Sequence, residues 1–360
     1  MKIISVNNEE IKKTCGGRSN YIFGASDTGK KLLRSLMAAG VRVNAIWDND
    51  ILKQGKSIEG VPIISFEKMK EEKDFNLYLG SAYAMQEADR IDTLNNVTVY
   101  QVGRSRDELE ALFTEDRVKF PAFVEGCRKN EIYYADDMSR RVSDAIIAYA
   151  VNYDGMATQK VVSTEEHYLI REVLEHLPDD AVFVDCGAFT GEFPIALIKN
   201  NISFQKCYCF EMEEGNCRTA RQNIEKIMGA GVNRVEVVNS GIAEQNGILY
   251  FESNSVNSKL TNYETDQKVK VVAIDSYFRD IKIDFVKMDI EGAELGALKG
   301  GINTIKRDRP VLAISVYHSL EDRVDIPKYL FDELENYKFY LRQHSIWFAE
   351  TVLYAVPTNR

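Results

Sequence analysis

The sequence predicts an α/β protein with two Rossmann-like domains joined by a helical connector. Its 360 residues exceed one typical domain of about 150 residues. Strand-like and helix-like segments alternate in two separate series, which is typical of βαβ units and mainly parallel sheets. We therefore expect a smaller accessory domain at 1–103, a helical connector at 104–180 and a larger domain at 181–360.

The first series predicts a small parallel sheet that ends near Gly103. Short apolar runs rich in Val, Ile, Phe and Tyr favour strands, and helical periodicity between them favours crossover helices. Strands are expected at 20–26, 41–50, 75–81 and 97–103, with helices at 28–40, 64–72 and 84–96.

The connector differs because its segments at 106–117, 121–154 and 164–177 are helix-like and contain no clear strand. The second series then predicts a larger sheet. Strands are expected at 181–187, 206–211, 234–242, 284–289, 310–316, 337–343 and 351–357, a hairpin at 247–252 and 269–274, and helices at 191–201, 214–229, 293–305 and 326–336. Because no helix separates the last two strands, we expect an antiparallel hairpin that closes the sheet.

Composition excludes several functional classes. Hydrophobic residues make up 45% of the chain, which is ordinary for a globular protein, and the net charge is −10. Nonspecific nucleic-acid binding depends on neutralising phosphates with Lys and Arg, so RNA and DNA are poor candidates for the substrate. No run of about 18 apolar residues predicts a membrane span.

The six cysteines contain no CxxC pair and no zinc-like spacing to the four histidines. Scattered thiols of this kind are typical of small core residues in a cytosolic protein. The N-terminal segment also lacks the apolar core and cleavage site of a secretory signal. We therefore expect a cytoplasmic protein.

The first glycine turn, "YIFGASDTGKK", is an incomplete dinucleotide fingerprint. Gly24 and Gly29 hold the first and third positions of GxGxxG, and Asp48 ends the next strand. Such a turn can direct backbone N–H groups at phosphate, while the acid holds ribose hydroxyls. Ser26, however, replaces the glycine that lets a pyrophosphate approach. A strand-to-helix turn without any dinucleotide is an equally good interpretation.

The second turn, "VFVDCGAFTGEF", favours a different cofactor. Asp185 ends an apolar strand, Gly187 and Gly191 flank a short loop, and Glu211 ends the following strand. A carboxylate at that strand end suits a ribose diol. Asp185 and Glu192 would repel a pyrophosphate, but they suit the ammonium and sulfonium groups of S-adenosyl-L-methionine (SAM). The turn therefore favours SAM over NAD.

The segments "VDCGAFTGEF", "CFE", "NSGIAEQNG" and "IDFVKMDIEGAELGALKGG" resemble the motifs of the FkbM-type SAM-dependent methyltransferases. The resemblance covers about 130–357, and its KxDxEGxE signature is complete from Lys287 to Glu294. Met212 departs from the family because proline is common at that position. The resemblance implies a class I methyltransferase fold, with a seven-stranded sheet whose last strand is antiparallel. It also implies O-methylation of a sugar hydroxyl in glycan or natural-product biosynthesis. The N-terminal segments at 23–33, 48–50 and 60–63 resemble small Rossmann-like domains of sugar-modifying enzymes.

The family pattern places the cofactor on the second glycine loop and the strand ends beside it. The expected cofactor-binding residues are Asp185, Gly187, Ala188, Phe189, Gly191, Glu192, Phe193, Glu211, Met212, Ser240 and Gly241.

The chemistry itself requires an acceptor hydroxyl aligned with the methyl carbon and a group that removes its proton. His318 and Asp289 are the base candidates, because both follow strands whose carboxyl ends should meet. Histidine has a suitable ordinary pKa of about 6.5, whereas Lys287 should oppose the raised pKa that Asp289 would need. Lys287 and Glu291 complete the predicted catalytic set.

Each candidate also has a structural interpretation. Lys287 and Asp289 share one strand face and are candidates for an ion pair. Glu294 is expected at a helix start, where the macrodipole favours acids. His318 is a candidate loop cap, and His344 is expected to be structural or peripheral. No metal is expected in the main interpretation; the alternative uses Asp289, Glu291 and His318 as ligands of a hard cation.

The sequence thus predicts a SAM-dependent O-methyltransferase that acts on a carbohydrate or related small molecule. Two alternatives remain: a sugar-modifying protein that binds NAD(P) or a nucleotide-sugar, and a non-catalytic binding module.

Overall fold

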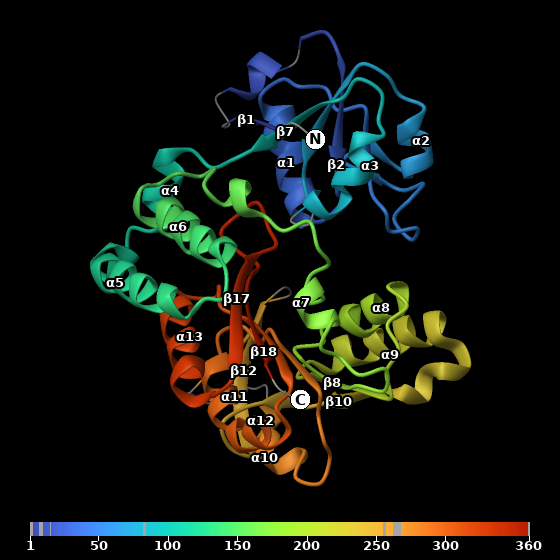
Figure 1. Cartoon of the computed structure of the whole chain (residues 1–360). Coiled ribbons are helices and arrows are strands. Elements are labelled where there is room, and N and C mark those ends of the chain that lie inside the picture. The colour runs from blue at the N-terminus through green and yellow to red at the C-terminus, as the bar shows by residue number, and fades with distance from the viewer. Residues whose placement is uncertain are drawn as a thin grey trace. The chain divides into compact units, whose positions relative to one another are not determined.

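The computed structural model describes residues 3–6, 10–14, 16–81, 84–254, 257–261 and 268–358 (Figure 1). Contacts divide the chain into two compact units. Unit 1 contains 1–120, 141–166 and 343–350, and unit 2 contains 121–140, 167–342 and 351–360. This division differs from the predicted boundaries at 103 and 180, because the expected connector contributes to both units.

Unit 1 is built on a seven-stranded sheet in the order β1-β7-β6-β2-β3-β5-β4. Its strands are parallel except for β4, which runs antiparallel to β5. The strands are β1 (Ile3–Val6), β2 (Ser19–Phe23), β3 (Ala45–Trp47), β4 (Ser57–Ile58), β5 (Val61–Ile64), β6 (Phe75–Leu79) and β7 (Thr98–Val102). The sequence analysis missed β1, β4 and β5, all of which are four residues or shorter.

Helices α1 to α6 occupy the first 151 residues, and α1 shows how local sequence sets a helix start. Ser26 caps α1 by accepting the Gly29 N–H, which satisfies one of the amides that a helix N-terminus leaves free. The helices are α1 (Asp27–Ala38), α2 (Phe66–Lys70), α3 (Ala88–Asp92), α4 (Arg106–Leu112), α5 (Phe120–Asn130) and α6 (Asp137–Val151).

Unit 2 contains the sheet that positions the candidate site, in the order β10-β9-β8-β15-β16-β18-β17. Strands β10 to β16 in that order are parallel, and β18 runs antiparallel to β16. The strands are β8 (Val182–Cys186), β9 (Lys206–Glu211), β10 (Val235–Asn239), β15 (Phe285–Met288), β16 (Val311–Ser315), β17 (Tyr337–Gln343) and β18 (Thr351–Pro357). The predicted seven-stranded sheet with an antiparallel closing strand is confirmed.

The remaining helices of unit 2 separate these strands, as a doubly wound fold requires. They are α7 (Arg171–Leu174), α8 (Glu192–Lys199), α9 (Glu214–Met228), α10 (Ile274–Tyr277), α11 (Glu294–Lys299), α12 (Ile302–Asp308) and α13 (Asp322–Glu333). The helix expected at 293–305 is two helices, because the chain turns at Gly300 and Gly301. A Cβ at Gly300 would lie 2.6 Å from the Ala243 carbonyl oxygen, so the backbones approach too closely for a side chain there.

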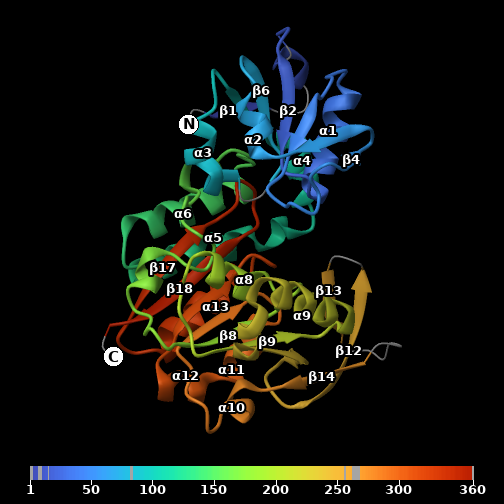
Figure 2. The same cartoon turned by 90° about the vertical axis from the view of Figure 1, so that its right-hand side faces the viewer.

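The expected hairpin belongs to a separate four-stranded sheet, in the order β11-β14-β12-β13 (Figure 2). Its strands are β11 (Gly241–Ile242), β12 (Gly247–Asn254), β13 (Asn257–Thr261) and β14 (Lys268–Val272). β12 pairs antiparallel with both β13 and β14.

The core of unit 2 lies between its sheet and α8. Phe193 stacks on Phe285 with ring centroids 5.4 Å apart, and Phe183 packs against both rings. Offset and edge-on aromatic pairs stabilise a core beyond the area that they bury. This packing fixes the start of α8 over the carboxyl end of β8, where the glycine loop lies.

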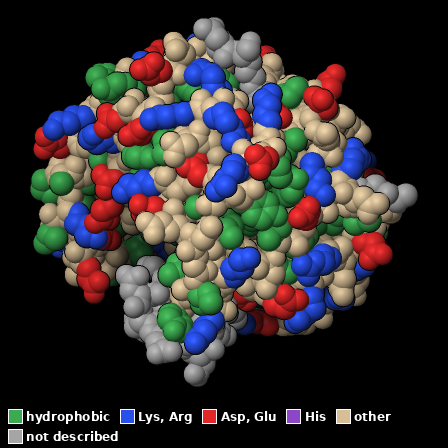
Figure 3. Space-filling view, turned by 90° about the horizontal axis from the view of Figure 1, so that it is seen from below, with side chains coloured by type: hydrophobic (Ala, Val, Ile, Leu, Met, Phe, Trp, Pro, Cys, Tyr) green, Lys and Arg blue, Asp and Glu red, His purple; other side chains and the backbone are tan. Residues whose placement is uncertain are grey.

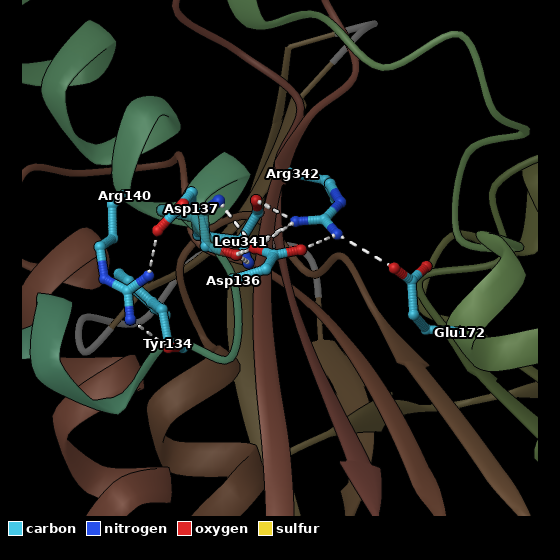
Figure 4. Close-up of polar contacts among 8 residues, drawn as sticks. Tyr134, Asp136, Asp137, Arg140, Glu172, Leu341 and Arg342 are labelled. Carbon is cyan, nitrogen blue, oxygen red and sulfur yellow. Dashed lines mark hydrogen bonds and ion pairs between the residues drawn. The ribbon is translucent and has the colours of Figure 1, made fainter.

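A partly buried ion cluster joins β17 to Asp136, directly before α6, and to Glu172 of α7 (Figure 4). The Arg342 guanidinium donates to Asp136 at 2.6 Å and to Glu172 at 3.2 Å. Although burial raises the pKa of Asp136, hydrogen bonds from Arg342 and Ser139 hold it below its ordinary value. We interpret this cluster as structural.

The protein surface in Figure 3 carries intermingled acidic and basic side chains on the face that is shown. No helix among the described residues is both long and apolar enough to cross a lipid bilayer.

Candidate functional site

The candidate site lies at the carboxyl edge of the parallel strands of unit 2. β8 and β16 flank β15 in the sheet. The glycine loop follows β8, the turn that contains Asp289 follows β15, and His318 follows β16. Ligands of open α/β sheets bind at this edge, so the topology brings the predicted residues together.

Gly187 lies directly against the turn after β15. Its φ of +83° favours glycine, and a Cβ there would stand 1.9 Å from the Asp289 carbonyl oxygen. Gly191 caps α8 with a φ of +84°. The two predicted glycines are therefore required by backbone conformation, and Gly187 also by close contact.

Several amides of this loop already have partners within the protein. Gly187 and Ala188 both donate to the Phe210 carbonyl, and Gly191 donates to the Ala188 carbonyl. Phe189 donates to the Glu211 carboxylate at 2.9 Å. A pyrophosphate cradle needs such amides free to face the ligand, so the loop conformation disfavours a dinucleotide.

Glu211 ends β9 with a buried carboxylate that holds two backbone segments. Oε2 accepts the Phe189 N–H, and Oε1 accepts the Glu213 N–H at 2.8 Å. Burial raises the pKa of Glu211, and the two amides oppose that shift. Each carboxylate oxygen keeps a second lone pair, so Glu211 can also accept hydrogen bonds from ribose hydroxyls.

The charge of Lys287 pairs across the sheet with Asp185. Lys287 lies opposite Asp185 in the β15–β8 register, and its Nζ lies 2.8 Å from Asp185 Oδ1. Nζ also donates to the Gly187 carbonyl at 2.6 Å. Burial lowers the pKa of Lys287, but the Asp185 carboxylate outweighs burial and keeps that pKa above its ordinary value. Lys287 was a candidate partner of Asp289, but its ion pair is with Asp185, which the register of β15 and β8 places opposite it.

Asp289 is held by two tyrosines that the sequence analysis did not identify. Tyr168 Oη donates to Asp289 Oδ2 at 2.9 Å, and Tyr317 Oη donates to Oδ1 at 3.2 Å. Burial raises the pKa of Asp289, but hydrogen bonds and the nearby Lys287 and His318 hold it well below its ordinary value. Asp289 is therefore an anion that can accept a hydrogen bond, and a weak base.

His318 lies among three carboxylates. Its Nε2 lies 3.3 Å from Asp289 Oδ1 and 3.7 Å from Glu291 Oε2, and its Nδ1 lies 3.3 Å from Glu294 Oε1. Burial lowers the pKa of His318, but the Asp289 and Glu294 carboxylates outweigh it and raise that pKa to about 10. The imidazole thus carries a proton at neutral pH, contrary to the ordinary pKa that made it a base candidate.

The two remaining acids of the KxDxEGxE segment differ in exposure. Glu291 has a φ of +58° and a side chain that is 38% exposed, and burial raises its pKa. Glu294 begins α11 as predicted, yet it is completely buried. Its Oε1 accepts the Ile290 N–H at 2.7 Å, so Glu294 also fixes the acidic turn.

The other predicted cofactor residues lie in different environments. Phe193 is a core residue, and Glu192 is exposed at the first turn of α8. Met212 packs against Val269 and Val271. The Ser240 hydroxyl donates to the Lys270 carbonyl, and Gly241 opens β11. The Phe189 side chain, by contrast, is 45% exposed beside Glu211, which leaves an apolar surface at the loop.

The glycine turn of unit 1 repeats part of this arrangement. The Asp48 carboxylate accepts the Ala25 N–H at 2.6 Å and the Asp50 N–H at 2.8 Å. A Cβ at Gly29 would lie 1.9 Å from the Gly24 carbonyl oxygen, so this glycine allows close packing of helix on strand. The turn was expected either to bind a dinucleotide or only to connect a strand to a helix, and this contact supports the second role.

Comparisons with known proteins agree with this geometry. Residues 185–342 match the family described as "Methyltransferase FkbM domain". Methyltransferase FkbM from Methylobacillus flagellatus KT is similar in fold, with a TM-score of 0.55 and 23% identity over 97% of this chain and 92% of that one. No curated protein matches the sequence.

Two further solved structures are similar to about half of the chain. One is an rRNA methylase from Streptococcus thermophilus, with a TM-score of 0.34 and 17% identity over 52% of this chain and 92% of that one. The other is TrmK from M. capricolum in complex with S-adenosyl-homocysteine, with a TM-score of 0.32 and 14% identity over 54% of this chain and 70% of that one.

The sheet order, the glycine loop and the acid that ends β9 define a class I methyltransferase fold. The matched region contains both the loop and the KxDxEGxE segment. Residues 185–342 therefore match the FkbM methyltransferase domain, and the chain is a SAM-dependent methyltransferase.

Proposed function

We propose that the protein transfers a methyl group from SAM to a hydroxyl of a sugar or related small molecule, in glycan or natural-product biosynthesis. The observation that carries this proposal is the polar cluster of Asp289, Glu291 and His318 in direct backbone contact with the glycine loop. Carboxylates and an imidazole suit a hydroxyl, which must be oriented by hydrogen bonds and must lose a proton.

The cofactor is proposed to lie along the loop from Gly187 to Gly191 and over the end of β9. Glu211 would accept the ribose hydroxyls with the lone pairs that its two amide contacts leave free. The exposed Phe189 ring would cover an apolar part of the ligand. When bound, SAM supplies the methyl group on a sulfonium that reacts by in-line displacement.

The acceptor is proposed to bind on the other side of Gly187, at the turn after β15. Asp289, kept anionic, would accept the hydroxyl's hydrogen bond, and His318 would fix its direction. Glu291 is the most exposed acid of the cluster with a raised pKa, so it is best suited to pass the proton to solvent. Lys287 would neutralise Asp185 rather than touch the acceptor.

The cytoplasm is the proposed location. Cys127, Cys186, Cys207, Cys209 and Cys217 are buried free thiols, which accords with a reducing compartment; Cys15 lies outside the described residues.

Transfer of a radiolabelled methyl group from SAM to a panel of sugars and glycosides tests the proposal. Asp289→Asn and His318→Ala should abolish transfer while leaving the affinity for S-adenosylhomocysteine within a few-fold. Unchanged activity in both variants would remove these residues from the acceptor site.

The acceptor class can be tested in cells. Glycans from a strain that lacks the gene should be lighter by one methylene unit at one position. A strain with unchanged glycans but an altered small-molecule metabolite would point to natural-product chemistry instead.

A further inference from the structure

The contacts of His318 form a pattern that hydroxyl binding alone does not explain. Two carboxylate oxygens lie on the Nε2 side of the ring, from Asp289 and Glu291. A third, from Glu294, lies on the Nδ1 side. Among the described residues, Asp289, Glu294 and His318 form a group whose potential ligand atoms all lie within 4.8 Å of one another.

This cluster is buried and its hydrogen bonding is incomplete. The His318 side chain is 10% exposed, and within the described residues neither ring nitrogen makes a well-aligned hydrogen bond. Glu294 is fully buried, and its Oε2 also has no hydrogen-bond partner in the described part of the chain. Buried polar atoms are normally satisfied, and each exception requires an explanation.

We propose that His318 Nε2, Asp289 and Glu291 bind a divalent cation, which displaces the Nε2 proton to solvent, and that Glu294 orients the imidazole by accepting the Nδ1 proton. Cation binding itself does not depend on the proposed function. Its catalytic role does, because a hydroxyl bound to such a cation loses its proton more readily.

The distances accord with this arrangement. Two ligand atoms that each lie about 2.1 Å from one ion stand about 3.0 to 3.4 Å apart in octahedral or tetrahedral geometry. The Nε2–Asp289 distance of 3.3 Å falls in that range, and the Nε2–Glu291 distance of 3.7 Å exceeds it by a few tenths of an ångström. The Glu291 side chain is 38% exposed, so it has room to move the remaining few tenths of an ångström toward Nε2.

The role of Glu294 follows from the chemistry of metal-bound histidines. A ligating imidazole usually donates its other N–H to a carboxylate, which fixes the tautomer and the ring orientation. Glu294 Oε1 stands 3.3 Å from Nδ1 and is itself fixed by the Ile290 N–H. Tyr168 and Tyr317 hold the Asp289 carboxylate in the same way.

The ligand set limits the identity of the cation. Carboxylates suit Mg²⁺ and Mn²⁺, whereas imidazole suits transition ions. Two carboxylates with one imidazole therefore favour a first-row transition ion such as Mn²⁺, with its other positions left to water or the acceptor.

Titration of the EDTA-treated full-length protein with MnCl₂, followed by electron paramagnetic resonance of free Mn²⁺, tests the inference without SAM or acceptor. We expect one Mn²⁺ per chain. Asp289→Asn and His318→Gln should weaken binding by more than tenfold. Glu294→Gln should weaken it by about 10- to 100-fold, as loss of an orienting carboxylate does.

His176→Gln provides a matched control, because the His176 ring is exposed and its Nδ1 hydrogen-bonds to the Glu172 carbonyl, away from the proposed ligands. This variant should bind Mn²⁺ like the wild type. Circular dichroism and S-adenosylhomocysteine affinity verify that each variant folds. Absence of stoichiometric Mn²⁺ binding, or binding that Asp289→Asn and His318→Gln leave unchanged, would overturn the inference.

The same preparations separate this inference from the proposed function. Mn²⁺ binding without methyl transfer to any hydroxyl would leave the cation site standing and count against the acceptor class. Methyl transfer that persists in EDTA, with no Mn²⁺ bound, would overturn the cation site and leave the proposed function intact.

Discussion

Breaking the buried pair of Lys287 and Asp185 should destabilise unit 2 strongly. Their side chains are 7% and 0% exposed, and Nζ lies 2.8 Å from Oδ1. At this distance the attraction is about 6 kcal/mol for an effective dielectric constant of 20. Burial raises the pKa of Asp185 even beside Lys287. Lys287→Met removes the attraction and leaves the Asp185 carboxyl buried without its partner, so we expect a loss of about 3–5 kcal/mol in the free energy of unfolding.

Urea unfolding followed by circular dichroism measures this loss. Both tryptophans, Trp47 and Trp347, lie in unit 1, so tryptophan fluorescence follows unit 1 and serves as an internal reference. Lys306→Met is the control, since Lys306 pairs with Glu333 at 2.5 Å in the same unit but is 49% exposed. Its cost should stay below about 1 kcal/mol.

The double variant Lys287→Met/Asp185→Asn tests whether the stability loss in Lys287→Met comes from the unpaired carboxyl of Asp185. Replacing both charges removes the unpaired carboxylate, so the double variant should be more stable than Lys287→Met alone. If Lys287→Met costs no more than Lys306→Met, or if the double variant is no more stable than Lys287→Met alone, the reasoning from the buried charge is refuted.

Three further predictions concern the site. Tyr168→Phe removes the 2.9 Å hydrogen bond to Asp289 and should lower kcat by about tenfold, the effect of losing a hydrogen bond to a charged group. Calorimetry should show an unchanged affinity for S-adenosylhomocysteine. A weakened affinity would place Tyr168 in the cofactor site instead. Gly187→Ala puts a Cβ 1.9 Å from the Asp289 carbonyl oxygen, so it should lower the melting temperature and abolish cofactor binding. The control is Gly215→Ala in α9, whose Cβ meets open space and which should be neutral or stabilising. Equal melting temperatures for the two variants would contradict the close contact. Because burial raises the pKa of Glu211 and only its carboxylate form accepts both ribose hydroxyls, cofactor affinity should fall on acidification, beginning above the ordinary carboxyl pKa of about 4.3. Glu211→Gln should remove the pH dependence of cofactor affinity. If Glu211→Gln keeps the wild-type pH profile, Glu211 is not the group that causes it.

The parts of the site that were predictable lie close together in the sequence. Gly187, Glu211 and Asp289 each follow an apolar strand, and the carboxyl ends of parallel strands meet at one edge. Strand position alone was therefore sufficient to place them together.

The parts that were missed depend on long-range contacts. Tyr168 reaches Asp289 across 121 positions of sequence, and it lies in a segment with a helical pattern where only Arg171–Leu174 is helical. The partner of Lys287 depends on the register between β15 and β8, which places Asp185 opposite it. The alternation of residues along a single strand does not reveal that register. Assignment of 343–350 to unit 1 likewise follows from packing rather than from a local pattern.

Environment also reversed one expectation about His318. Its ordinary pKa suggested a base, but the surrounding carboxylates, which come from a different strand end and helix, raise that pKa to about 10. Only the folded arrangement of Asp289 and Glu294 around the ring shows this effect.

Calorimetric binding of S-adenosylhomocysteine and of NAD, each to the wild type and to Glu211→Ala, tests most directly that unit 2 holds SAM through its glycine loop. We predict one site for S-adenosylhomocysteine, weakened about a hundredfold or more in Glu211→Ala because two hydrogen bonds to a charged group are lost. Asp48→Ala, which alters the corresponding acid of unit 1, should leave that affinity unchanged. Binding of NAD alone, or S-adenosylhomocysteine binding that is unaffected by Glu211→Ala, would contradict the account.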